Sequence, residues 1–175
     1  MESTAEKTRY ITILRHLFSI VMHNFISDIS HYDIVLNLAI QAKNSLWIGT
    51  ADIKDLYVIQ GQTEKPFLGI LSELIGHGVE VRLIHAKEPG PNFRKDFDKY
   101  PSLARMLERV LCPRVHFKII IIDQKICYIG SANLTGAGMG MKSAYRRNFE
   151  AGILTDNSDY YCPLNNKSVQ QHSHK

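Results

Sequence analysis

The sequence predicts an α/β domain in which a mixed β-sheet is flanked by helices. Short apolar runs rich in β-branched residues alternate with segments whose apolar residues recur at helical spacing. Towards the C-terminus, two apolar runs are separated only by Asp123-Gln124-Lys125, which is typical of a β-hairpin. Alternating strands and helices favour parallel pairing, and the hairpin adds antiparallel strands, so a mixed sheet covered by helices is expected.

The N-terminal segment predicts an amphipathic helix over residues 4–25. Its apolar stripe consists of Leu14, Leu17, Phe18, Val21 and Phe25. Residues 10–26 are apolar, but they contain Arg15, His16 and His23 and are too short to span a bilayer comfortably. We expect this helix to contact a partner or a second copy of the chain, with a membrane-surface anchor as the alternative.

The middle of the chain predicts two helices and two strands. A helix over residues 30–44 leads into a buried strand over 46–51, whose single tryptophan is expected in the core. A second helix follows Pro66, and glycines end it before a strand over 79–85.

The segment before the hairpin predicts a loop and a further helix. Residues 88–92 are rich in proline and glycine and read as a loop. The residues that then recur at helical spacing are Leu103, Met106, Leu107 and Val110, and Cys112-Pro113 is expected to end their helix.

Composition fits one globular domain with a mildly basic surface. The chain has 175 residues, 45% hydrophobic and 22% charged, with a formal net charge of +4. We expect an N-terminal element over residues 1–30, a catalytic domain over 31–156 and a polar tail over 157–175. The basic balance fits a polyanionic partner such as nucleic acid, and it fits an ordinary solvated surface equally well.

Cysteine usage favours a reducing compartment. The cysteines are Cys112, Cys127 and Cys162. Their number is odd and their spacing does not suit zinc, and the N-terminus lacks the pattern of a secretory signal. A cytoplasmic location without a bound metal is therefore expected.

The most informative stretch runs from Val115 to Asn133. His116 and Lys118 are two residues apart, so they point to the same side of a predicted strand. Ser131 and Asn133 leave the return strand near the end where His116 lies. An imidazole, an ammonium, a hydroxyl and a carboxamide can together hold a phosphate and attack it.

These residues resemble a known motif. The string His116-x-Lys118-x4-Asp123-x6-Gly130-Ser131-x-Asn133 is similar to the HKD motif of the phospholipase D superfamily. At ordinary residue frequencies, a chance match has a probability of roughly 10⁻⁸ per starting position. The segment 148–154 resembles the strand that carries the family's His-orienting carboxylate, which would be Glu150 here.

The resemblance implies a metal-independent phosphodiesterase with no cofactor. Only one HKD motif is present, as in the small members of the superfamily that form homodimers around one shared site. His116 would act as nucleophile and as general acid in the two chains, with Glu150 orienting it. Lys118, Ser131 and Asn133 would bind phosphate, whereas Asp123 and Gly130 would be structural.

The substrate is less narrowly defined. Residues 135–141 are rich in glycine and are expected to form a flexible rim over the site. Lys142, Arg146 and Arg147 follow and are predicted to contact substrate phosphates, although a solvated basic loop has the same composition. An endonuclease acting on DNA or RNA is the main hypothesis. A phospholipid phosphodiesterase and a nucleic-acid-binding subunit of a restriction or repair assembly are the alternatives.

Overall fold

The computed structural model describes residues 21–54, 56–87 and 90–160. Most of the predicted N-terminal helix, residues 4–20, lies outside the described residues. So do residues 161–175 of the polar tail. Within the described parts, no helix is long and apolar enough to cross a membrane.

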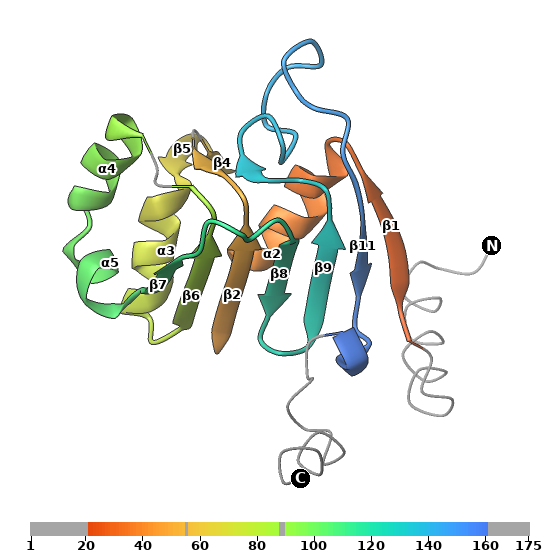
Figure 1. Cartoon of the computed structure of the whole chain (residues 1–175), viewed down its shortest axis with the longest axis horizontal. Coiled ribbons are helices and arrows are strands. Elements are labelled where there is room, and N and C mark those ends of the chain that lie inside the picture. The colour runs from red at the N-terminus through yellow and green to blue at the C-terminus, as the bar shows by residue number, and fades with distance from the viewer. Residues whose placement is uncertain (1–20, 55, 88–89, 161–175) are drawn as a thin grey trace, which may run out of the picture.

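A mixed seven-stranded sheet forms the centre of the molecule (Figure 1). In spatial order its strands are β1 (His23–Ser27), β11 (Ala151–Thr155), β9 (Ile126–Gly130), β8 (Lys118–Ile122), β2 (Ser45–Thr50), β6 (Glu80–His85) and β7 (Glu108–Leu111). β2, β6 and β7 are parallel to one another, and all other neighbours are antiparallel. The predicted mixed sheet with flanking helices is therefore confirmed.

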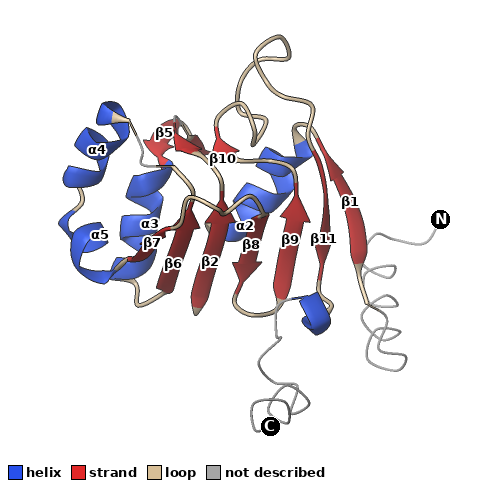
Figure 2. Cartoon of the chain, in the orientation of Figure 1, coloured by secondary structure: helices blue, strands red, loops and turns tan. Residues whose placement is uncertain are grey.

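Helices and small sheets complete the fold, as Figure 2 shows. The helices are the π-helix η1 (His31–Leu36), α2 (Asn37–Ala39), α3 (Phe67–Gly76), α4 (Pro91–Asp98), α5 (Pro101–Met106) and the 3₁₀-helix η2 (Ser158–Tyr160). Two small sheets pair β3 (Ile53–Lys54) with β10 (Leu134–Thr135), and β4 (Tyr57–Gln60) with β5 (Thr63–Pro66).

The hydrophobic core lies between these helices and one face of the sheet. Strand alternation places Leu46, Ile48 and Ile120 on this face, together with the fully buried Tyr128. The predicted inward stripe of α3 is buried against them. That stripe consists of Phe67, Ile70, Leu71 and Leu74. All the described α-helices contribute to this one core cluster, so they cover the same side of the sheet.

The opposite face carries an apolar row that crosses every strand of the large sheet. In register order the row is Phe25, Ile153, Ile129, Ile119, Gly49, Ile84 and Val110. The Phe117 ring lies over Gly49, where a Cβ would collide with it. Trp47, which was expected in the core, lies half-buried on this face with Arg82 over its ring at 4.9 Å. That expectation was wrong because strand alternation turns Trp47 away from the helices.

Strands occupy the C-terminal ends of two predicted helices. Residues 23–27 form the edge strand β1, which pairs with β11, so the helix predicted to run to residue 25 was wrong there. The helix predicted through Val110 ends at Met106, and β7 follows it beside β6. In both places the unpaired edge of a neighbouring strand supplies backbone hydrogen bonds that outweigh the local helical spacing.

Other predictions needed smaller corrections. The helix expected over 30–44 ends at Ala39, and α4 begins at Pro91 inside the expected loop. The glycine-rich segment 135–141 is not a flexible rim, since most of it is buried and Met139 is fully enclosed. The backbone of Gly140 lies so close to Asp28 that a Cβ would come within 2.9 Å of its carbonyl oxygen.

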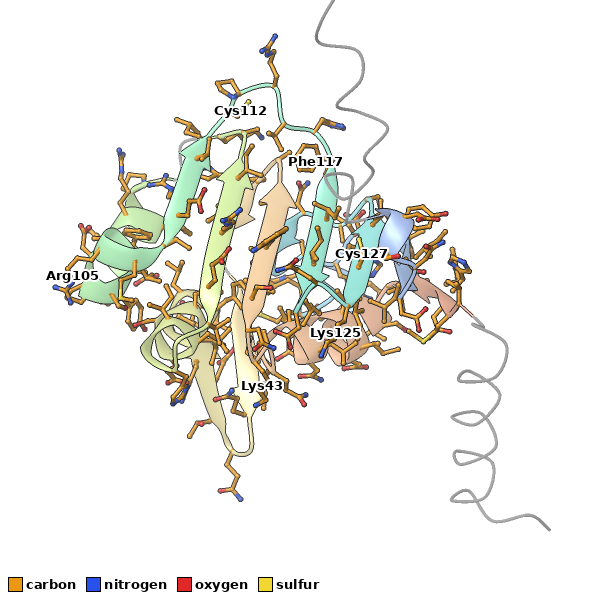
Figure 3. The ribbon with its side chains drawn as sticks, turned by 90° about the horizontal axis from the view of Figure 1, so that it is seen from below. Lys43, Arg105, Cys112, Phe117, Lys125 and Cys127 are labelled. Carbon is orange, nitrogen blue, oxygen red and sulfur yellow. The ribbon has the colours of Figure 1, made fainter. Side chains whose placement is uncertain are left out.

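The predicted hairpin between β8 and β9 is present and is fixed by its turn. Three residues lie between the paired Ile122 and Ile126. Asp123 and Gln124 both have positive φ, 52° and 50°, and the N–H of Lys125 closes this tight turn on the carbonyl oxygen of Ile122 at 3.0 Å. The Asp123 carboxylate accepts hydrogen bonds from the backbone N–H groups of Lys43, Asn44 and Ser45. Asp123 therefore joins the hairpin to the start of β2. Figure 3 shows this end of the sheet at Lys43 and Lys125, away from Phe117.

The Asp123 contacts predict pH-dependent stability. Partial burial raises the pKa of Asp123, but the three backbone N–H groups favour the carboxylate, and the net result is a pKa below its usual range. The stabilisation is therefore complete above the unfolded pKa of about 3.9 and is lost as pH falls through the folded pKa. Asp123→Asn should lower the free energy of unfolding by about 2 kcal/mol at neutral pH.

Urea denaturation at several pH values measures this difference. It should shrink as pH falls below about 4 and the native carboxyl becomes protonated at its lowered pKa. Asp98→Asn, at an exposed position in α4, is the matched control and should change stability little. A penalty for Asp123→Asn that stays constant down to strong acid would contradict the assignment.

Candidate active site

The residues of the predicted motif meet at one end of the sheet. β8 begins with Lys118, β9 ends with Gly130, β11 begins with Ala151 and β2 ends with Thr50. Because β11 and β9, β9 and β8, and β8 and β2 are all antiparallel neighbours, these termini lie at the same end of the sheet. The sheet register therefore brings together residues that are more than eighty positions apart in the sequence.

Lys118 provides a buried positive charge. Its side chain is only 8% exposed, and Nζ donates a hydrogen bond to the backbone carbonyl oxygen of His116 at 2.8 Å. An ammonium group has three donors, and this is its only hydrogen bond to a described residue. A buried cation with unused donors is a strong binding group for an anion.

His116 lies beside Lys118 but outside the strand. β8 begins at Lys118, so the predicted strand is two residues too long at this end. His116 is exposed, and its ring makes no hydrogen bond with any described residue. The exposed position leaves the imidazole accessible to a substrate.

Glu150 and Ser131 form a closed hydrogen-bonded group. The Ser131 hydroxyl donates to Glu150 Oε2, and Asn148 Nδ2 donates to Glu150 Oε1 at 3.0 Å. Ser131 Oγ in turn accepts from the N–H of Ala151 at 3.1 Å. Glu150 is thus bound to Ser131 and Asn148, and the expected hydrogen bond to His116 is absent among the described contacts. The Ser131 hydroxyl has to break its hydrogen bond to Glu150 before it can donate to a phosphate.

Asn133 is oriented by residues that the sequence did not single out. Its Oδ1 accepts from the N–H of Asp52 at 3.2 Å and lies 3.4 Å from Thr50 Oγ1. Thr50 also accepts a hydrogen bond from the N–H of Leu134. With Oδ1 committed in this way, the amide NH₂ of Asn133 is left to donate to a ligand. A threonine that ends an apolar strand was the only sequence signal for Thr50.

Tyr128 packs against the motif glycine of the site, and the sequence did not single it out. Its ring fills the space where a Cβ on Gly130 or Gly152 would lie. These glycines are register partners on adjacent strands, and Gly130 also faces Lys118. Burial raises the pKa of Tyr128, so the phenol is neutral. The only sequence signal was a tyrosine two residues before the motif glycine.

The predicted substrate contacts lie in the loop between β10 and β11. Lys142 and Arg147 are half-buried, and Arg146 is exposed. The loop extends beyond the end of the sheet that holds Gly130 and Ala151. Within the described residues, no cluster of His, Cys, Asp or Glu could hold a metal ion.

Comparison with known proteins identifies the family. A family model described as "Cardiolipin synthase, PLD-like domain" matches residues 35–171. The chain therefore belongs to the PLD-like family of the phospholipase D superfamily, which is a superfamily of phosphodiesterases. No curated protein matches its sequence.

Solved structures share the fold at low sequence identity. NucT from Helicobacter pylori has a TM-score of 0.58 and 18% identity, covering 81% of this chain and 89% of its own. Nuc, a phospholipase D family member from Salmonella typhimurium, has a TM-score of 0.54 and 20% identity. The match covers 81% of this chain and 87% of Nuc. A phosphatidylserine synthase from Haemophilus influenzae has a TM-score of 0.55 and 13% identity. The match covers 79% of this chain and 35% of the synthase.

The close packing of Tyr128 generates a prediction about Gly130. Gly130→Ala should lower the free energy of unfolding by about 1–3 kcal/mol, because the new methyl group meets the Tyr128 hydroxyl and the Ala151 carbonyl oxygen. Gly76→Ala is the control, since a Cβ at Gly76 meets nothing within 4 Å. Urea denaturation compares the two variants. Equal stability of both would show that Tyr128 does not pack closely beneath Gly130.

Proposed function

We propose that this protein is a metal-independent phosphodiesterase that cleaves DNA or RNA. The observation that carries the proposal is the convergence of His116, Lys118, Ser131, Asn133 and Glu150 at one end of the sheet. A phosphodiester repels nucleophiles because it is negatively charged. The buried ammonium of Lys118 and the free amide NH₂ of Asn133 stabilise that charge and the further charge of the transition state.

His116 supplies the reacting nitrogen. In the proposed first step, a neutral imidazole attacks phosphorus, an N–P bond forms, and the bond from phosphorus to the leaving oxygen breaks. A second, protonated imidazole gives its proton to the leaving oxygen. In the next step this second ring removes a proton from water, and the resulting hydroxide breaks the N–P bond and releases the phosphate monoester.

The two imidazoles come from two copies of the chain. Each chain has a single HKD motif, so a two-fold homodimer would provide both rings at a shared site. The exposed position of His116 and its lack of a described hydrogen-bond partner support this arrangement. Glu150 would orient one ring after exchanging its contact with Ser131.

Nucleic acid is favoured as substrate by the charge near the site. Lys142, Arg146 and Arg147 follow the motif, and the net charge is +4. The fold alone does not choose the substrate, because a phosphatidylserine synthase shares it. A phospholipid substrate is therefore the second candidate, supported by the apolar sequence of residues 10–26.

The first functional prediction is cleavage without metal. Wild-type protein should cleave DNA or RNA in the presence of EDTA, as measured on gels with labelled single-stranded and duplex substrates. His116→Ala should lower the rate by at least about 10³-fold, because it removes both the nucleophile and the proton donor, and binding should be retained.

The outcomes separate the competing functions. Cleavage that requires added metal contradicts the proposed chemistry. Release of a headgroup from phospholipid vesicles, with no cleavage of nucleic acid, favours the lipid phosphodiesterase. Tight nucleic-acid binding without cleavage, together with a co-purifying protein, favours a binding subunit of a larger assembly.

The second functional prediction tests the shared site. Co-expression of wild-type and His116→Ala chains in equal amounts should leave about a quarter of the activity of the same total amount of wild-type protein, because only dimers of two wild-type chains have both rings. Independent sites in each chain would leave about half. His77→Ala, which changes an exposed histidine after α3, is the control partner and should leave activity unchanged.

A further inference from the structure

The loop between β10 and β11 has a fixed base and a projecting tip. The N–H of Lys142 donates to the carbonyl of Gly136, and the N–H of Asn148 donates to that of Ala137, both at 3.1 Å. Met139, between these contacts, is fully buried. We name residues 142–149 the arm. Figure 1 shows that it projects beyond the sheet on the side where β9 ends and β11 begins.

The arm has a defined shape. The carbonyl oxygen of Ser143 accepts hydrogen bonds from the N–H groups of Arg146 and Arg147, at 2.8 and 3.1 Å. These bonds close a turn at the tip. The arm therefore displays its side chains on an ordered backbone that is anchored at both ends.

Two aromatic side chains on the arm are fully exposed. Tyr145 is 101% exposed and Phe149 is 94% exposed. Aromatic side chains of this size usually bury most of their surface, and Tyr145 and Phe149 pack on no described element. Such rings are available to stack on the faces of another molecule.

The cations of the arm are not neutralised within the described structure. Several other basic residues on the surface, Lys54, Lys65, Arg82 and Lys99, form ion pairs with carboxylates. None of the ion pairs found between described residues includes Lys142, Arg146 or Arg147. The arm thus alternates aromatic faces with cations that are free to bind an external anion.

We propose that the arm binds the unpaired bases of single-stranded nucleic acid. The rings would stack on bases, and the cations would contact the intervening phosphates. Duplex DNA hides its base faces within its own stack, so it offers the cations a partner but not the rings. The inference rests on the proposed function, because it assumes a nucleic-acid phosphodiester at His116 and Lys118.

The arm is continuous with the catalytic group. Phe149 directly precedes Glu150, and Asn148 Nδ2 donates to Glu150 Oε1 at 3.0 Å. A strand whose phosphate is held at the site can therefore continue over the arm. A lipid surface fits less well, because membrane binding depends on buried apolar area, and the arm offers only two large apolar side chains between cations.

Binding measurements test the stacking residues. In the non-cleaving His116→Ala background, Tyr145→Ala and Phe149→Ala should each raise the Kd for a labelled single-stranded oligonucleotide by roughly 5- to 150-fold. The Kd for the matching duplex should change much less. Tyr160→Ala is the control, since Tyr160 is a half-exposed tyrosine in η2, at the opposite end of the sheet, and should leave both values unchanged.

The salt dependence of binding tests the cations of the arm. Arg146→Gln should reduce the slope of log Kd against log salt concentration by about 0.7 for a single strand, the value expected for one lost phosphate contact. Arg105→Gln is the matched control, because Arg105 is exposed on α5 at the far side of the molecule in Figure 3. An unchanged slope for Arg146→Gln would remove this residue from the binding surface.

The outcomes keep the arm separate from the catalytic proposal. If the Tyr145→Ala and Phe149→Ala variants lose the same affinity for single strands and duplex, or lose none for either, the proposed role of the arm is wrong. Weakened binding to phosphatidylcholine/phosphatidylserine vesicles with unchanged oligonucleotide binding would assign it to a membrane instead. A changed oligomeric state in sedimentation with unchanged binding would assign it to the dimer contact. If the wild-type enzyme cleaves nucleic acid and the arm variants are fully active, only the proposed role of the arm is wrong. If binding depends on the arm but no cleavage occurs, only the catalytic proposal is wrong.

Discussion

The register of three antiparallel strands is the constraint on which the candidate site depends. Lys118, Gly130 and Gly152 lie in one row across β8, β9 and β11. A shift of one residue would turn Lys118 to the other face and remove its ammonium from the site. Tyr128 opposes such a shift, because its ring packs where only glycines leave room. The register is fixed at the other end by the Asp123 contacts with the start of β2.

The groups proposed to bind the substrate phosphate are held in place by the fold itself. The Lys118 ammonium is buried, and the Asn133 amide is oriented through Asp52 and Thr50. Donors that are already oriented need little reorganisation in the transition state. Glu150 is different, because its carboxylate is shared between Ser131 and Asn148 and has to exchange a partner to reach an imidazole.

In the proposed function, the end of the sheet binds the phosphodiester and the projecting arm selects the substrate. The sheet end carries groups suited to any phosphodiester, and the same fold occurs in a phosphatidylserine synthase. Selectivity then has to come from what is attached to that end. A loop with a buried base and exposed rings is well suited to this, since loops vary freely on a stable scaffold. The open apolar face, with Phe117 over Gly49, is a separate feature of the scaffold.

The sequence by itself determined the hairpin, the motif residues and the alternation of strands with helices, because these depend on local periodicity and turn chemistry. It could not determine that residues 23–27 and 108–111 are strands, since a free strand edge overrides helical spacing only once the sheet exists. Nor could it show that Tyr128 is buried while Tyr145 is exposed. Burial is set by the neighbours that folding brings from distant parts of the chain, and only the tertiary structure supplies those neighbours.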